Sequence, residues 1–437
     1  MSSKPIDRAA PVQGVVVIHP ERGDRGSGRS AEARLEEAVG LALALDLEVR
    51  DAIIAPLRKV TPATLFGKGK VEEIGELCEA HDAAVAVVDD ALTPVQQRNL
   101  EKAWQVKVMD RTGMILEIFA RRARTREGRL QVELARLSYE RSRLVRTWTH
   151  LERQRGGFGV MGGPGETQIE TDRRLIAEKI AKLKRDLLEV RRTRNLQRAA
   201  RQRAPVPSVA LVGYTNAGKS TLFNRLTQSA VVAQDMLFAT LDPTLRTLNL
   251  PDGRPCILSD TVGFISDLPH ELVEAFRATL EEVREADVIL HVRDLSNPDS
   301  DAQAADVREV LSRLEVEIDE RRLIEVWNKI DLLDPDTKDE VLGDARRGGV
   351  PAIPVSAVTG EGISDLLTAI SGLVDEAPPV SVHAPAGEGA AIAWLYRHGR
   401  VMQREDDDAG GVHLAVRLSP QALGQFEQLF PHAGLTS

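Results

Sequence analysis

One octapeptide constrains the fold of this 437-residue chain more than any other feature: GYTNAGKS, residues 213–220. It matches G-x-x-x-x-G-K-[ST], follows the apolar run SVALV and leads into the helix-like run STLFNRLTQ. The motif needs a strand before it and a helix after it, because its backbone amides surround a phosphate at the helix N-terminus. The sequence therefore predicts a nucleotide-binding, doubly wound α/β domain over residues 206–376, with its ligand at the carboxyl ends of the strands.

Four side chains and amides are expected around the phosphates. Lys219 would reach the β- and γ-phosphates, and the Ser220 hydroxyl would bind Mg²⁺. In SDTVGF (259–264), Asp260 would hold Mg²⁺ through water, and the Gly263 amide would contact the γ-phosphate. The two motifs together indicate a nucleoside triphosphate with its metal ion.

Two later motifs select the base. In NKID (328–331), the Asp331 carboxylate can accept two hydrogen bonds from guanine N1 and N2, whereas adenine has no matching donors. Lys329 would pack over the base, and SAVTG (356–360) would present backbone amides to the guanine oxygen. The nucleotide is therefore expected to be GTP.

The sequence also indicates how hydrolysis is controlled. Thr240, in LFATLDPT, is expected to complete the coordination of Mg²⁺ when GTP is bound, with Thr244 as the runner-up. Phe264 stands where Ras-type GTPases place a water-orienting Gln, so hydrolysis by the protein alone should be slow. Asn216 could bind a K⁺ ion that acts like an arginine finger, or it could simply cap the phosphate-binding loop.

The predicted site residues are as follows. The predicted catalytic residues are Lys219, Thr240 and Gly263. The predicted nucleotide-binding residues are Gly213, Tyr214, Thr215, Asn216, Ala217, Gly218, Lys219, Ser220, Thr221, Phe238, Ala239, Thr240, Leu241, Asp242, Asp260, Thr261, Val262, Gly263, Asn328, Lys329, Ile330, Asp331, Ser356, Ala357 and Val358. The predicted metal ligands are Ser220, Thr240 and, through water, Asp260 for Mg²⁺, with Asn216 for K⁺.

A smaller α/β domain is expected before residue 113. Strand-like runs at 14–18, 83–91 and 105–110 alternate with helical patterns at 31–45 and 70–81, which is typical of a mainly parallel sheet. LFGKGKVEE (65–73) could place Lys68 or Lys70 near a phosphate, but a simple turn before a helix explains it as well. We place this domain at residues 1–112.

The next segment carries the basic charge of the chain. The net charge is −9, yet residues 121–203 contain 23 Lys and Arg against 10 Asp and Glu, and the remainder contains 34 against 56. Such segregation favours a surface for a polyanion, although a solvated helical face is the plain alternative. Apolar residues recur every three or four positions over 130–151 and 176–190, which predicts an antiparallel helical hairpin over 113–203. Thr167 and Glu170 form a capping-box pattern, so the second helix is expected to begin just past the glycines.

The C-terminal part and the cysteines carry less information. RAPVPS (203–208) and EAPPVSVHAPAGEG (376–389) read as linkers. AIAWLYRH and GVHLAVRL are expected to be strands and PQALGQFEQLF a helix, in a small α+β module over 385–437.

Cys78 and Cys256 have no metal-ligand spacing and fit reduced, structural thiols of a cytoplasmic protein. No apolar run reaches the roughly 18 residues of a membrane span, and the N-terminus lacks a signal-peptide core.

Several of these stretches together resemble the HflX family of translation-factor-like GTPases. They are GKGKVEE, DRTGMILEIFARRARTREGRLQVELARL (110–137), the RGGFG and GPGETQIETDRR parts of the glycine loop, and the set GYTNAGKS, FATLDPT, DTVGF, NKID and SAVTG. The resemblance covers most of residues 60–375. It implies a cytoplasmic, Mg²⁺-dependent GTPase that is expected to be a monomer, to bind the large (50S) ribosomal subunit and to split or rescue stalled or idle 70S ribosomes under stress.

 The family's N-terminal domains contact ribosomal RNA near the peptidyl transferase centre, and GTP is hydrolysed on the ribosome. An ATP-directed activity of the N-terminal region is attributed to some members, but no second phosphate-binding loop or base-selecting carboxylate stands before residue 200.

The resemblance gives the glycine-rich stretch RGGFGVMGGPGETQIETDRR (155–174) a role. Arginine-rich helices can follow RNA phosphates, and a glycine tip has little bulk, so it can enter a narrow RNA crevice. A floppy hairpin turn is the alternative, although a turn needs far fewer residues. The expected RNA contacts are Arg153, Arg155, Gly156, Gly157, Phe158, Gly159, Arg173 and Arg174.

Three other functions remain open from the sequence. One is a GTP-dependent assembly factor of the large subunit, and another is an RNA-remodelling ATPase that uses the N-terminal domain. The third is a regulatory scaffold whose basic hairpin binds a protein or anionic lipid.

Overall fold

The computed structural model describes residues 13–22, 29–154, 164–201, 206–228, 237–268, 281–313, 322–345, 352–374, 380–407, 410–418, 420–431 and 433–436. The chain divides into two compact units, Met1–Leu366 and Leu367–Ser437. Within the described parts, no helix is both long enough and apolar enough to cross a membrane.

The first unit begins with a four-stranded parallel sheet in the order β2-β1-β3-β4. Its strands are β1 (Gly14–Glu21), β2 (Glu48–Pro56), β3 (Val85–Val88) and β4 (Lys107–Asp110). Its helices are α1 (Ala31–Leu43), α2 (Lys68–Ala80), α3 (Pro94–Trp104) and α4 (Arg111–Arg122). The predicted α/β class is confirmed. Sequence analysis missed β2, an edge strand of mixed polarity, and α3, although Thr93 and Gln96 form a complete capping box at its start.

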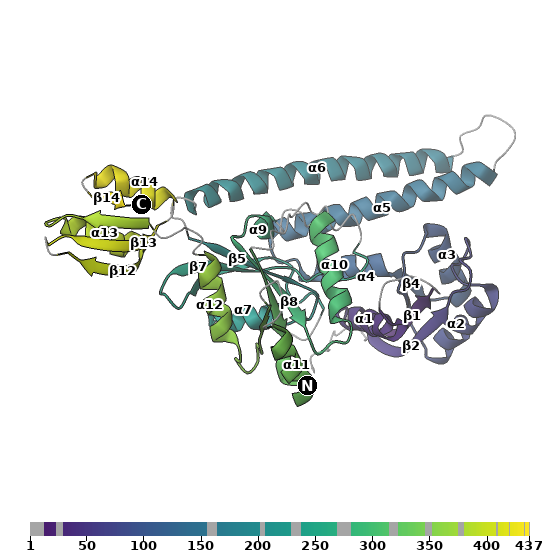
Figure 1. Cartoon of the computed structure of the whole chain (residues 1–437). Coiled ribbons are helices and arrows are strands. Elements are labelled where there is room, and N and C mark those ends of the chain that lie inside the picture. Colours follow the sequence, from purple (N-terminus) through teal and green to yellow (C-terminus); the bar gives the residue numbers. More distant parts are fainter. Residues whose placement is uncertain are drawn as a thin grey trace, which may run out of the picture. The chain divides into compact units, whose positions relative to one another are not determined.

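The expected helical pair follows, as α5 (Arg126–Gln154) and α6 (Pro164–Arg201), which pack side by side (Figure 1). On α6, Ile180, Leu183 and Leu187 are buried, as the predicted seam requires. The predicted start of the second helix is wrong. The helix begins at Pro164, because proline at the first helical position has the right backbone angle and lacks only an N–H that would have no helical partner.

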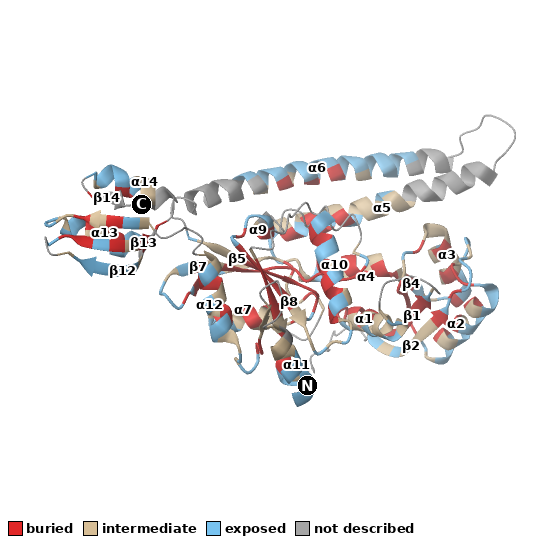
Figure 2. Ribbon diagram, viewed as in Figure 1, coloured by how far each residue is buried: buried red, intermediate tan, exposed pale blue. Residues whose placement is uncertain are grey.

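The nucleotide-binding domain is built on a mixed six-stranded sheet in the order β10-β9-β8-β5-β7-β6. Its strands are β5 (Ser208–Gly213), β6 (Thr244–Asn249), β7 (Pro255–Asp260), β8 (Val288–Asp294), β9 (Leu323–Asn328) and β10 (Ala352–Pro354). Its helices are α7 (Lys219–Thr227), α9 (Glu281–Arg284), α10 (Ser300–Arg313), η2 (Ile330–Leu332), α11 (Pro335–Ala345) and α12 (Ile363–Val374). Only β6 pairs antiparallel, and the central strands β5 and β8 are buried (Figure 2). The predicted doubly wound class is confirmed.

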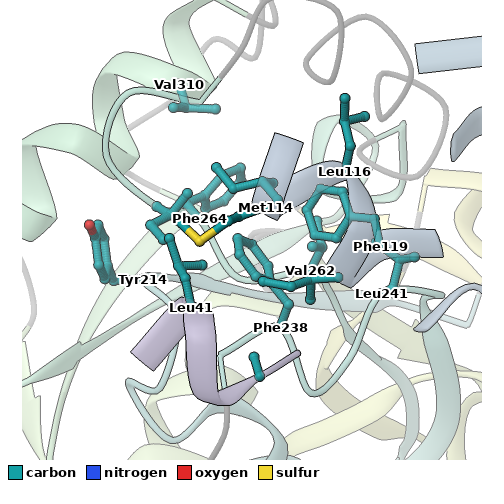
Figure 3. Close-up of a cluster of buried hydrophobic side chains, with 14 of the residues drawn as sticks. Leu41, Met114, Leu116, Phe119, Tyr214, Phe238, Leu241, Val262, Phe264 and Val310 are labelled. Carbon is teal, nitrogen blue, oxygen red and sulfur yellow. The ribbon is translucent and has the colours of Figure 1, made fainter. Parts of the chain in front are cut away.

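One hydrophobic cluster joins the N-terminal sheet domain to the nucleotide-binding domain (Figure 3). This central cluster includes Leu41, Met114, Phe119, Tyr214, Phe238, Leu241, Val262 and Phe264. The rings of Phe119 in α4 and Phe238 meet edge to face, with their centroids 4.6 Å apart and their planes at 81°. Burying one such side chain contributes about 1.5–3 kcal/mol, so the two domains share a substantial part of their core.

The second unit contains a four-stranded antiparallel sheet in the order β12-β13-β11-β14. Its elements after α12 are β11 (Val380–Ala384), α13 (Gly389–His398), β12 (Arg400–Asp406), β13 (Val412–Arg417), α14 (Pro420–Leu429) and β14 (Gly434–Thr436).

Two local expectations for this unit are wrong. AIAWLYRH is a helix, because Ala391 and Leu395 are buried four residues apart on one helical face, and Trp394 stacks on His398 at the same spacing. The expected linker 376–389 contains the strand β11, whose alternating Val382 and Ala384 are buried. GVHLAVRL forms a strand and PQALGQFEQLF a helix, as predicted.

Candidate nucleotide-binding site

The phosphate-binding loop connects β5 to α7 and requires its glycines. At Gly213, φ is +154°, and a Cβ atom would lie 2.2 Å from the carbonyl oxygen of Val292. At Gly218, φ is +89°, and a Cβ atom would lie 2.2 Å from Asn328 Nδ2. A side chain at either position would displace β8 or the base-recognition motif, so the loop keeps its shape only with glycine there.

A pocket opens on this loop. Its lining residues are Thr215, Asn216, Gly218, Lys219, Ser220, Thr221, Phe238, Ala239, Thr240, Thr261 and Gly263. All eleven belong to the set that the sequence predicts for the nucleotide. A Cβ atom at Gly263 would lie 3.0 Å from Lys219 Nζ and 2.9 Å from Thr215 Cα, so this glycine lets the backbone of the D-T-V-G motif approach the loop.

The three predicted Mg²⁺ ligands converge at the pocket. Ser220 Oγ donates to Asp260 Oδ2 over 2.8 Å, and Thr240 Oγ1 donates to the same oxygen over 3.0 Å. The two hydroxyl oxygens are 2.9 Å apart. Thr244, the runner-up, instead begins β6 and pairs with Asp260 through the backbone register. Three oxygen atoms at these separations form a donor set that suits a hard cation such as Mg²⁺.

Asp260 has the electrostatic character of a metal-binding carboxylate. Burial raises its pKa, although hydrogen bonds from Ser220 and Thr240 and the charge of Lys219 oppose the change. Its Oδ1 atom is buried and has no hydrogen-bond partner among the described residues. A buried carboxylate oxygen without a partner is costly, and a metal-bound water would satisfy it. The residues present therefore fit the ion that P-loop GTPases generally use.

Lys219 is held inside the loop by backbone carbonyl groups. Its Nζ donates to the carbonyl oxygen of Gly213 over 3.0 Å and to that of Tyr214 over 2.6 Å. Burial lowers the pKa of Lys219 to about 8, and the nearby Asp260 carboxylate only partly opposes this. Phosphate oxygens beside the ammonium group would favour its charged form.

The two motifs that are predicted to select the base meet the phosphate-binding loop through one side chain, Asn328. Asn328 Nδ2 donates to the carbonyl oxygen of Ala217 over 2.9 Å, and Asn328 Oδ1 accepts from the Ala357 amide over 3.1 Å. Lys329 has φ +67° and its Nζ lies 2.7 Å from Asp294 Oδ2. The Asp331 carboxylate is exposed and has no partner in the part of the chain that the structure describes. Since Asn328 uses the Ala357 amide, the guanine oxygen would have to meet other amides of SAVTG.

The remaining predicted nucleotide contacts lie around this arrangement. Ile330 and Ser356 are buried, whereas Val358 is exposed. Leu241 and Val262 are packed in the central cluster. Asp242 is turned away from the pocket: its Oδ2 accepts from the amides of Arg124 and Thr125 over 2.8 and 2.9 Å, at the start of α5.

Phe264 lies inside the protein rather than at the reacting phosphate. Its side chain is buried in the central cluster (Figure 3). Its amide donates to the carbonyl oxygen of Gly213 over 3.1 Å, and its carbonyl oxygen accepts from Thr215 over 2.7 Å. The residue fixes the D-T-V-G motif to the phosphate-binding loop, and it offers no polar group to a water molecule.

A buried polar network, which the sequence did not predict, lies beside the phosphate-binding loop. This Glu37 network consists of Arg29, Glu37, Asp89, Arg111, Tyr214 and Ser266. Tyr214 donates its hydroxyl proton to Glu37 and accepts from the Ser266 amide over 2.8 Å. The four charged side chains are at most 7% exposed, Arg29 pairs with Glu37, and Arg111 pairs with both Glu37 and Asp89. No spacing signal could reveal the network, because its members come from six separate stretches of the chain.

The carboxylates of this network stay charged. Burial alone would raise the pKa of Glu37, but Arg111, Arg29 and the Tyr214 hydroxyl outweigh it and hold that pKa below its ordinary value. For Asp89 the effect of burial is likewise outweighed, mainly by Arg111, and its pKa is also lowered. The network is therefore a set of paired charges of the N-terminal domain, which Tyr214 and Ser266 of the nucleotide-binding domain join through hydrogen bonds.

The predicted RNA contacts are only partly described. Arg155, Gly156, Gly157, Phe158 and Gly159 lie outside the described residues, as does the side chain of Arg153. Arg173 and Arg174 are exposed on α6, where Arg174 lies 3.8 Å from Glu178. Elsewhere, Lys68 and Lys70 form ion pairs with Glu72 and Glu73 of their own helix, which favours the simple turn over a phosphate site.

Four stretches of the chain match known families. Residues 32–120 match the family described as GTP-binding GTPase N-terminal, 122–201 the GTP-binding GTPase Middle Region, 208–329 the 50S ribosome-binding GTPase and 345–431 the HflX C-terminal domain.

Whole-length relatives agree with these matches. GTPase HflX of Magnetococcus marinus is 53% identical over 395 residues, which cover 90% of each chain. GTPase HflX of Escherichia coli K12 is 44% identical over 385 residues, which cover 88% of this chain and 89% of the relative. A solved structure described as the SsGBP and GDP complex is 24% identical, covers 83% of this chain and 98% of its own, and has a TM-score of 0.48. The chain therefore belongs to the HflX family of GTPases, and its GTPase domain to the 50S ribosome-binding GTPases.

Proposed function

We propose that this GTPase is a Mg²⁺-dependent cytoplasmic switch that binds the 50S subunit in its GTP form and splits or rescues stalled or idle 70S ribosomes under stress. It acts as a monomer, and hydrolysis permits its release. The observation that carries the proposal is that the N-terminal domain and the start of the basic hairpin bond to the two loops that are expected to meet the γ-phosphate and its Mg²⁺, the D-T-V-G loop and the Thr240 loop. Through these contacts, the state of the γ-phosphate can alter the surface that faces the ribosome.

The first contact runs from the Thr240 loop to the basic hairpin. Thr240 is the proposed Mg²⁺ ligand, and Asp242 two residues later binds the amides of Arg124 and Thr125. Those amides precede α5, the first arm of the hairpin. Phe238 on the other side of Thr240 packs on Phe119 of α4. Movement of Thr240 on hydrolysis would therefore pull on both ends of the α4–α5 connection.

The second contact runs from the D-T-V-G loop to the N-terminal sheet domain. Gly263 is expected to bind the γ-phosphate, and Ser266 three residues later accepts through its carbonyl oxygen from Arg111 over 3.0 Å. Tyr214 in the phosphate-binding loop joins the same network through Glu37. Leaving a buried hydrogen-bonding group without its partner costs about 1–3 kcal/mol, so a shift of this loop would be transmitted to Arg111 and Glu37 rather than absorbed.

The chain's own groups suit slow hydrolysis with outside help. Lys219 and the Gly263 amide would stabilise charge on the transferred phosphoryl group, and bound Mg²⁺ would add Lewis-acid stabilisation there. Phe264 has no group that can orient a water molecule. Asn216 lines the pocket, is exposed and has φ +60°, so we propose it as the ligand of an activating K⁺ ion.

The basic hairpin supplies the proposed contact with ribosomal RNA. Arg173 and Arg174 on α6 are exposed, and the sequence predicts further RNA contacts from residues 155–159, which lie outside the described residues. Contacts of arginine with phosphates should weaken steeply with salt, because binding releases counterions.

The test is GTP hydrolysis by the purified protein alone and with 50S, 30S or 70S particles, each in K⁺ and in Na⁺. We expect stimulation by 50S and 70S particles but not by 30S, greater activity in K⁺, and splitting of 70S particles in sedimentation. Absence of stimulation by any particle would remove the ribosome from the mechanism and leave the GTP site intact. Preferential binding to immature large subunits would favour an assembly factor instead.

A further inference from the structure

Two histidines and an aspartate meet at one end of the C-terminal sheet, and none of the three belongs to the nucleotide-binding site. His383 in β11 and His413 in β13 are directly paired across the antiparallel ladder, so their side chains share one face of the sheet. Their ring centroids are 4.4 Å apart. Asp407 follows β12, and its Oδ2 lies 3.1 Å from His383 Nε2 and 3.9 Å from His413 Nε2.

We propose that His383, Asp407 and His413 bind Zn²⁺ or a chemically similar divalent transition-metal ion. Tetrahedral Zn²⁺ with bonds of about 2.0–2.1 Å separates its ligand atoms by roughly 3.3 Å. The two measured distances to Asp407 Oδ2 lie on either side of that value, and the three ligand atoms are all within 4.8 Å of one another. Two imidazole nitrogens and one carboxylate oxygen form a donor set that prefers zinc over Mg²⁺.

Gly411 keeps the space between these ligand atoms open. A Cβ atom at this position would lie 2.6 Å from Asp407 Oδ2 and 2.9 Å from His383 Nε2. The neighbouring Gly410 has φ +84° and is needed for the turn, whereas Gly411 does not have a left-handed backbone. The turn therefore does not require glycine at position 411. Glycine is needed there because the backbone passes close to the ligand atoms and leaves no room for a side chain.

The carboxylate is also oriented for the metal ion. Asp407 Oδ1 accepts from the Gly411 amide over 2.8 Å, which directs Oδ2 toward the two imidazoles. A supporting hydrogen bond of this kind is usual for carboxylates that bind metals. A hydrogen bond to Asp407 explains the position of the His383 ring without a metal ion. It does not explain that of His413, because the 3.9 Å between His413 Nε2 and Asp407 Oδ2 is too long for a hydrogen bond.

Three protein ligands leave a fourth position for water. The ion would tie the end of β12 and its turn to β11, two segments that are not neighbours in the sheet order. Its chief effect should therefore be to stabilise the C-terminal sheet.

The experiment uses the full-length, untagged protein, loaded with GDP and Mg²⁺ and treated with a chelator. Co²⁺ is titrated while the visible absorption of tetrahedral Co²⁺ is recorded, and Zn²⁺ is then added as a competitor. Calorimetry with Zn²⁺ in excess Mg²⁺ gives the stoichiometry and affinity. We expect one ion per chain, and a loss of affinity of at least about tenfold in His383→Gln and in His413→Gln.

His398→Gln is the matched control, since His398 belongs to the same unit but stacks on Trp394. It should bind Zn²⁺ like the unaltered protein. Gly411→Ala should lose affinity because its methyl group would occupy the site. Equal Zn²⁺ affinity in the unaltered protein and the His383→Gln/His413→Gln double variant would overturn the proposal. If a variant fails to fold, the Co²⁺ spectrum of the unaltered protein decides, and absence of the tetrahedral absorption rejects the site.

Discussion

Tyr214, the second residue of the phosphate-binding loop, donates its hydroxyl proton to Glu37 in α1 of the N-terminal domain. The same hydroxyl accepts from the Ser266 amide and from Arg29 Nη1, over 2.8 and 2.9 Å. A single side chain thus joins the phosphate-binding loop, the segment after the D-T-V-G motif and the N-terminal domain.

Tyr214→Phe should destabilise the protein by about 1–3 kcal/mol, because it leaves buried polar partners unsatisfied while keeping the ring in the central cluster. Calorimetric thermal unfolding measures this. Stimulation of GTP hydrolysis by 50S particles should also fall if the hydroxyl transmits the nucleotide state. Tyr396→Phe, at an exposed tyrosine, is the control and should change stability by less than about 0.5 kcal/mol. Equal stability of the two variants would argue against the network.

Acid should weaken the first unit through Glu37. Its pKa is lowered in the folded protein, so the stability it contributes is complete above its ordinary pKa of 4.5 and is lost as the pH falls through the folded value. Glu37→Gln should therefore flatten the acid side of the stability profile. Thermal unfolding as a function of pH measures the slope, with exposed Glu340→Gln in α11 as the control. An acid slope unchanged by Glu37→Gln would contradict this assignment.

Nucleotide binding should take up a proton near pH 8. Burial lowers the pKa of Lys219 to about 8 despite the charge of Asp260, and the phosphates should raise it. The contribution of Lys219 to affinity is then complete below pH 8 and declines as the pH rises through the pKa of the bound form. Calorimetry of GTP binding in buffers of different ionisation enthalpy detects the proton. The Lys219→Arg variant should take up no proton on GTP binding, because arginine stays charged. Proton uptake that persists in this variant would show that another group binds the proton.

The predicted role of Thr240 as a Mg²⁺ ligand can be tested against that of Thr244, the runner-up. Thr240→Ala should reduce GTP hydrolysis roughly 10²-fold, because its hydroxyl lies with Ser220 at the Asp260 carboxylate. Thr244→Ala should have little effect, since that residue begins β6. Single-turnover hydrolysis at saturating Mg²⁺ makes the comparison. A larger loss for Thr244→Ala would reverse the assignment.

Base selection can be tested at Asp331. Asp331→Asn should weaken GTP binding by about 1–3 kcal/mol and shift preference toward xanthosine nucleotides, whose base offers an acceptor where guanine has a donor. Competition binding with GTP and XTP measures the preference. Asp339→Asn, at an exposed position in α11, is the control. Undiminished selectivity for GTP in Asp331→Asn would reject the role of this carboxylate.

The sequence by itself determined the fold class, and it predicted the residues that line the pocket at the phosphate-binding loop. Its motifs act over a few residues: Gly213 and Gly218 are required by local backbone geometry, and Lys219 and Ser220 follow them on one helix. The apolar seam of α6 was likewise readable, because burial of Ile180, Leu183 and Leu187 follows helical spacing.

Only the tertiary structure decided which distant groups meet. Glu37 and Tyr214 are far apart in the chain, as are His383 and His413, and no local pattern encodes their contacts. The helix at AIAWLYRH has the same ambiguity, since a short apolar run fits a strand or a helix until its neighbours cover one face. Local chemistry thus specified the nucleotide, while packing between distant segments specified what the nucleotide site is connected to.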